Sequence, residues 1–80
     1  MNKAFMIFSG CPSDGCLLVF AENRNKAKSL SVGSNWDWEY QDMNSRREPE
    51  YDKYATKPMR IEDNSELPEG APPFFSDIEL

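Results

Sequence analysis

The side chains that could do chemistry in this 80-residue chain are two cysteines and an excess of carboxylates, because the chain contains no histidine. Histidine is the commonest general base and metal ligand near neutral pH, so its absence excludes Ser-His-Asp and Cys-His catalysis. A structural zinc ion usually takes four Cys or His ligands, and two cysteines fall short of that number. We therefore expect the chain to be no enzyme and to need no metal or other cofactor.

Cys11 and Cys16 flank a four-residue loop in which Pro12, Asp14 and Gly15 favour a tight turn. If the flanking segments form a hairpin, the two cysteines could face each other at a separation that a disulfide can bridge. No signal peptide is visible, so a reducing cytoplasm and two reduced thiols are the first interpretation. A disulfide formed under oxidising handling and metal or redox chemistry are the alternatives.

Asp37 and Glu39 lie two positions apart in residues 36–41, where aromatic and polar side chains alternate. This alternation predicts a half-buried strand over residues 36–42, with the aromatic side chains on one face. General acid–base catalysis needs a carboxyl group shielded from water, which a solvated strand face does not provide. Side chains on one strand face lie about 6.8 Å apart, so Asp37 and Glu39, joined by Asp42, could imitate successive phosphates. An ordinary solvated strand face is the alternative.

The acidity of the chain is concentrated in its last twenty residues, 61–80, which carry six carboxylates and no basic side chain. Residues 1–60 carry nine Lys and Arg against eight Asp and Glu. Like charges and three prolines predict an extended coil that is dispensable for folding. An acidic surface favours a partner protein with a basic surface, and Phe74 and Phe75 would serve as apolar anchors. The predicted partner-binding carboxylates of this segment are Glu62, Asp63, Glu66, Glu69, Asp77 and Glu79.

The elements that must position these side chains form a small α+β domain. Residues 4–8 and 17–21 are continuous apolar runs and predict two strands of an antiparallel hairpin, each covered on both faces. Asn23 as N-cap and Gly33 just past the C-terminus delimit a short helix that packs on the sheet through Ala27 and Leu30. With a third strand at residues 36–42, the predicted domain spans residues 1–60, followed by the acidic segment 61–80.

Three segments resemble short proteins of phages and prophages: residues 5–8, the run VFAENRNKAK at 19–28 and the run RREPEYDKY at 46–54. Those proteins begin with a strand and carry a similar strand-to-helix junction and a later RR-x-P segment. The resemblance covers roughly the first 54 residues. It implies a viral accessory protein that acts in the cytoplasm of an infected bacterium, and it carries over no catalytic residue.

Together these features predict a non-enzymatic protein that binds and inhibits a host nucleic-acid-handling defence protein of the CRISPR or restriction type. Its acidic residues would occupy a groove meant for DNA or RNA. One alternative is a single-stranded nucleic-acid-binding module, with stacking on Trp36, Trp38 and Tyr40 and phosphate contacts from basic side chains. Another is a structural or assembly protein. No apolar run is long enough to span a membrane, and the sequence does not indicate the oligomeric state.

Overall fold

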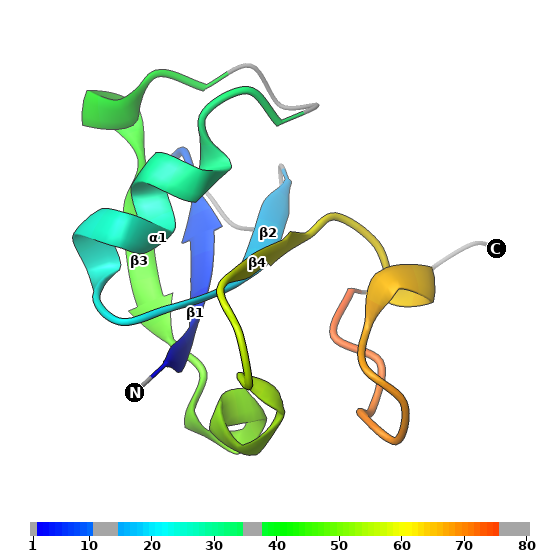
Figure 1. Ribbon diagram of the computed structural model, residues 1–80. Helices are drawn as coiled ribbons and strands as arrows, with labels where there is room; N and C mark the ends of the chain where they lie inside the picture. The colour runs from blue at the N-terminus through cyan, green and yellow to red at the C-terminus, as the bar shows by residue number, and fades with distance from the viewer. Residues whose placement is uncertain (1, 11–14, 35–37, 76–80) are drawn as a thin grey trace, which may run out of the picture.

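A four-stranded antiparallel sheet occupies the centre of the molecule (Figure 1). The computed structural model describes residues 2–10, 15–34 and 38–75. The strands are β1 (Lys3–Phe8), β2 (Cys16–Ala21), β3 (Asn44–Arg47) and β4 (Met59–Ile61), and they lie in the order β3-β1-β2-β4. With the helix α1 (Arg24–Ser31), this sheet confirms the predicted α+β class, and β4 is an additional strand that the sequence analysis did not predict.

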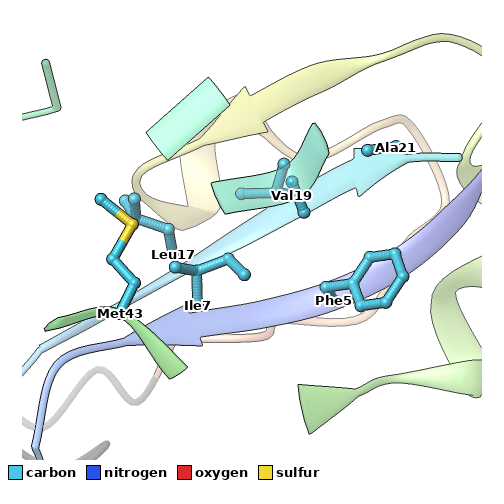
Figure 2. Packing of buried hydrophobic residues seen from close by; sticks show 7 residues of the cluster. Phe5, Ile7, Leu17, Val19, Ala21 and Met43 are labelled. Atoms are coloured by element: carbon cyan, nitrogen blue, oxygen red, sulfur yellow. The ribbon is translucent and has the colours of Figure 1, made fainter. Parts of the chain in front are cut away.

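The two predicted apolar runs form the two central strands. In the antiparallel register of β1 and β2, Phe5 lies opposite Val19 and Ile7 opposite Leu17. All four side chains are buried in one cluster with Ala21, Ala27 and Met43 (Figure 2). Side chains on the other face of the same strands, including Leu18 and Phe20, are buried as well. The continuous apolar pattern thus has the cause assumed in the prediction, because both faces are covered.

Helix α1 begins and ends where its capping residues predict. The Asn23 side chain accepts a hydrogen bond from the Lys26 backbone N–H at 2.9 Å, and Gly33 follows the helix with a φ of +87°. The buried side chains of the helix are Ala27 and Ser31. Leu30, which was also predicted to pack on the sheet, is 36% exposed and does not belong to the buried core. Residues four apart lie on one helix face, and this face is the one turned to the sheet.

The third strand begins later than predicted. Within residues 38–42, Trp38 and Glu39 are irregular and Tyr40–Asp42 form a 3-10 helix, so this part of the predicted strand is wrong. Trp36 and Asp37 lie outside the described residues. Trp38 packs against the first core cluster while Tyr40 is exposed, so the alternating aromatics do not share one face. Strand β3 lies at the edge of the sheet and its side chains are polar. It forms by backbone pairing with β1, in a register that places Arg47 opposite Phe5.

The second face of the sheet is covered by two segments, the 3-10 helix Pro49–Tyr54 and residues 62–75. We call residues 62–75 the C-terminal layer. Its side chains Leu67, Ala71, Phe74 and Phe75 pack against the buried cluster Ala4, Leu18, Phe20, Tyr51, Ala55 and Ile61. The predicted boundary between residues 60 and 61 falls inside β4. The layer is irregular apart from a 3-10 helix at Asn64–Glu66, but it shares a core with the sheet and is no separate tail.

Candidate partner-binding surfaces

The C-terminal layer is attached to the sheet by Tyr51. Its hydroxyl group lies 2.9 Å from the Pro72 carbonyl oxygen and 3.1 Å from that of Pro73. The ring of Tyr51 contacts the Phe74 ring edge to face, with 5.5 Å between the centroids. Phe74 in turn packs edge to face on Phe75 at 4.9 Å. Both predicted anchor residues, Phe74 and Phe75, are therefore used inside the molecule.

Asn64 closes the layer on itself. Its side-chain oxygen accepts hydrogen bonds from the backbone N–H groups of Phe74 at 3.1 Å and Phe75 at 2.9 Å. Its side-chain nitrogen donates to the Phe75 carbonyl at 3.0 Å. One amide side chain thus fixes the returning segment against the 3-10 helix in which it lies.

Three of the four described carboxylates of the layer form a hydrogen bond or an ion pair. Glu62 forms an ion pair with Arg60 at 2.9 Å. Asp63 caps the 3-10 helix by accepting from the Ser65 N–H at 2.9 Å, and Glu66 accepts from the Glu62 N–H at 2.7 Å. Glu69 is exposed, and Asp77 and Glu79 lie outside the described residues. Glu62, Asp63 and Glu66 are thus fixed by contacts within residues 60–66.

The predicted strand row of carboxylates is absent from the described residues. Glu39 is exposed and accepts a hydrogen bond from the Gln41 side chain at 3.0 Å. Asp42 is exposed in the 3-10 helix. Without a strand at residues 38–42, the predicted spacing of successive phosphates is not formed by these side chains. Glu39 and Asp42 remain acidic surface residues on the α1 side of the sheet.

Most basic side chains that would serve the nucleic-acid alternative are neutralised within the chain. Ion pairs join Lys26 to Glu22 at 2.8 Å and Arg46 to Glu48 at 2.9 Å, and Arg47 pairs with Asp52. Lys28 lies over the Tyr40 ring at 5.8 Å. Within residues 2–10, 15–34 and 38–75, α1 packs on one face of the sheet (Figure 1), and the 3-10 helix Pro49–Tyr54 and the C-terminal layer pack on the other. No open aromatic sheet face for base stacking exists in this part of the chain.

Cys16 is half-buried at the start of β2. Burial raises the pKa of its thiol, the Glu48 carboxylate raises it further, and Arg46 opposes both effects. The group is therefore a protonated thiol at neutral pH and a poor nucleophile. Cys11 lies outside the described residues. In the described part of the chain no three Cys, Asp or Glu side chains converge in a way that could hold a metal ion.

Tyr51 and Asn64 are the residues that sequence analysis missed. Tyr51 and Tyr54 are three positions apart, a spacing that allows one helical turn, and the structure has a 3-10 helix there. Nothing in the local sequence points to acceptors on Pro72 and Pro73. The available signal was the set of apolar side chains Leu67, Ala71, Phe74 and Phe75, which an unfolded acidic tail would not need.

Comparison of the chain with protein-family models, with curated proteins and with solved structures found no match. Among the residues that the structure describes, no helix has the length and apolar character needed to cross a membrane.

Proposed function

We propose that this chain is a non-enzymatic binding protein of the phage accessory type, whose acidic C-terminal layer occupies a basic groove on a host protein that handles nucleic acid. Occupation of the groove would exclude DNA or RNA and inhibit a defence effector of the CRISPR or restriction type. The phage context comes from the sequence resemblance, and the mode of binding comes from the distribution of charge.

The observation that carries this proposal is the anchoring of the acidic surface. Residues 61–80 hold no basic side chain, and Tyr51 and Asn64 fix the layer through hydrogen bonds to residues 72–75. A flexible acidic tail would lose conformational entropy when it binds. The backbone of a packed layer has already lost most of this conformational entropy on folding, so more of the interaction energy of its carboxylates appears as affinity.

The remaining surfaces of the sheet favour binding through this layer. The two edge strands are short, and each carries arginine, with Arg46 and Arg47 on β3 and Arg60 on β4. Short, charged edges discourage the addition of a further strand. Contact through side chains of the C-terminal layer is therefore favoured over pairing of the backbone with a partner strand.

The test is an inhibition assay on purified CRISPR effector complexes and restriction endonucleases. We expect the full chain to prevent at least one effector from binding its DNA or RNA in a mobility-shift assay, and excess nucleic acid to compete with the chain. The double variant Glu66→Lys, Glu69→Lys should weaken inhibition at least about tenfold, because it reverses two charges of the layer.

The matched control is Glu39→Lys, Asp42→Lys, which reverses the same number of carboxylates on the α1 side of the sheet. This variant should inhibit like the parent chain, and both variants should melt cooperatively. If the control loses inhibition and the layer variant keeps it, the binding surface is wrongly assigned. If no effector is displaced from its nucleic acid, the proposed function itself is wrong.

A further inference from the structure

A second charged feature, of opposite sign, lies at the other side of the sheet. The register of β1 and β2 places Lys3 opposite Ala21, the last residue of β2. The chain then passes through Glu22 and Asn23 into α1, which therefore starts beside the first residues of β1 (Figure 1). Pairing of β1 with β3 brings Arg47 opposite Phe5 at the same end of the sheet.

These segments enclose an open recess of about 270 Å³. Its lining combines three cationic side chains from three separate elements with one carboxylate and two uncharged residues: Lys3, Arg24, Arg47, Glu22, Asn23 and Phe5. A water molecule takes a share of about 30 Å³ in the liquid, so the recess has room for a tetrahedral oxyanion and several of its water molecules.

The carboxylates near the recess are already engaged. Glu22 pairs with Lys26 at 2.8 Å, and this hydrogen bond lowers the pKa of Glu22. Asp52 pairs with Arg47 and also accepts a hydrogen bond from the Ala4 N–H at 2.8 Å. In contrast, neither Lys3 nor Arg24 has an ion-pair partner within residues 2–10, 15–34 and 38–75. The recess therefore has an excess of positive charge.

The orientation of Arg47 suits an incoming anion. Its guanidinium lies 5.6 Å from the centre of the Phe5 ring and is held there by the Asp52 carboxylate, so it costs little entropy to position. The first turn of α1, which borders the recess, contains no acidic residue that would cancel the positive end of the helix. The guanidinium groups of Arg47 and Arg24 and the ammonium group of Lys3 can together donate several hydrogen bonds to the oxygens of one phosphate group.

We propose that the recess formed by Lys3, Arg24 and Arg47 is a phosphate-binding site. The ligand carries either a phosphate monoester, as in a free nucleotide, or a phosphodiester, as in a nucleic acid backbone. The site lies on the α1 side of the sheet, and the acidic layer covers the opposite side. It does not depend on the function proposed for that layer, and either proposal can fail without the other.

The test is an NMR titration of the full chain at constant ionic strength, with chloride replaced stepwise by inorganic phosphate, adenosine monophosphate or a six-nucleotide single strand without terminal phosphate. We expect saturable shifts of the Arg24 and Asn25 amide signals. The double variant Lys3→Gln, Arg24→Gln should weaken phosphate binding at least about tenfold, which corresponds to about 1.4 kcal/mol. The matched control Lys28→Gln, Lys57→Gln removes two positive charges elsewhere and should bind like the parent chain.

Tighter binding of adenosine monophosphate than of the oligonucleotide would assign the site to monoesters, and the reverse order would assign it to nucleic acid backbones. Both results uphold a phosphate site. Shifts that grow linearly without saturation for all three ligands would overturn it. Equal weakening in the Lys28 and Lys57 control would overturn it too, because binding would then depend on total charge instead of on the recess.

Discussion

Tyr51 shows how one side chain can join two parts of a small protein. Its ring belongs to the buried cluster on the second sheet face, and its hydroxyl group reaches the carbonyl oxygens of Pro72 and Pro73. A proline residue lacks the N–H group needed for a backbone ladder, but its carbonyl remains a good acceptor. The hydroxyl group therefore supplies the fixing contact that regular secondary structure would provide elsewhere.

We predict that Tyr51→Phe lowers the free energy of unfolding by about 1 kcal/mol, since it removes the part-buried hydrogen bonds of the hydroxyl group while keeping the ring. Urea denaturation followed by tryptophan fluorescence measures the change. The control is Tyr54→Phe, whose hydroxyl donates to the Gly70 carbonyl at 3.1 Å in an exposed position and should cost less. Equal effects of the two substitutions would contradict a special role for Tyr51.

The same hydroxyl group predicts a dependence of stability on alkaline pH. Burial raises the pKa of Tyr51, and the nearby carboxylates of Glu50 and Glu48 act in the same direction. The unfolded chain therefore loses this proton first, and its contribution to stability is complete below about pH 10 and lost as pH rises through the ordinary and then the raised pKa. Urea midpoints measured across this range should fall less steeply for Tyr51→Phe than for the parent chain.

Cys16 provides a prediction about reactivity. In a Cys11→Ser chain, whose only thiol is Cys16, a disulfide reagent should react with the folded protein more slowly than with the urea-unfolded protein at the same pH. The reason is the raised thiol pKa and the half-buried position at the start of β2. The rate should rise with pH beyond the ordinary range of cysteine. A folded-state rate equal to the unfolded rate would show that the thiol is an ordinary exposed one.

At the scale of elements, the start and end of α1 are set by capping residues in the local sequence. Its eight residues leave little internal helix stability, so the cap at Asn23 matters. We predict that Asn23→Ala lowers the free energy of unfolding by about 1 kcal/mol. Asn25→Ala, an exposed change two positions on, should be neutral or stabilising because alanine is the better helix former. Thermal melts of both variants measure the change, and an equal loss of stability in the two would contradict a capping role for Asn23.

The C-terminal layer is predicted to be necessary for a cooperative fold. A chain ending at Ile61 would expose Phe20, Tyr51 and the second core cluster to water. It should bind a hydrophobic dye and melt broadly at a lower temperature than the full chain. A chain ending at Phe75 keeps the layer and is the control, which should melt like the full chain. Sharp melting of the shorter chain near the temperature of the full one would contradict this.

Sequence patterns predicted those elements whose signals are local. The hairpin strands are continuous apolar runs, and α1 has recognisable capping residues, so both were predicted to within a residue or two. Strands β3 and β4 are short and contain arginine, and they exist because β1 and β2 offer them backbone partners. Pairing between distant segments gives neither segment a periodic pattern, so these two strands could not be predicted from their own sequence. The packing of the C-terminal layer was signalled only by its few apolar side chains.

Of the two candidate sites, one was visible in the local sequence and the other was not. The acidity of the C-terminal segment was visible as composition, and four of its six carboxylates belong to the described C-terminal layer. The phosphate-binding recess was not visible, because Lys3, Arg24 and Arg47 are far apart in the sequence and meet only through the register of three elements. Asp37 and Glu39 were assigned to a strand that the described residues around Glu39 do not form.

At the scale of the whole molecule, two oppositely charged surfaces lie on opposite sides of one sheet. We predict that association with a basic partner slows as salt rises, because the Debye length falls from about 10 Å at 0.1 M to about 3 Å at 1 M. Stopped-flow association rates should show this, and the Glu66→Lys, Glu69→Lys variant should be slower and less sensitive to salt. An association rate independent of salt would exclude steering by the acidic layer.

The strand order has a consequence for how the chain reaches its fold. Of the strands in this chain, the two that come first in the sequence become the centre of the sheet, while their outer neighbours β3 and β4 and the covering segments come later in the sequence. The hairpin of β1 and β2 is thus apolar on both faces, and both faces remain exposed to water until residues 24–31 and 43–75 pack on them. Contacts between residues so far apart are slow to form, and domains rich in them fold in milliseconds to seconds. The nascent hairpin is consequently the stage at which this protein is most exposed to aggregation and to chaperones.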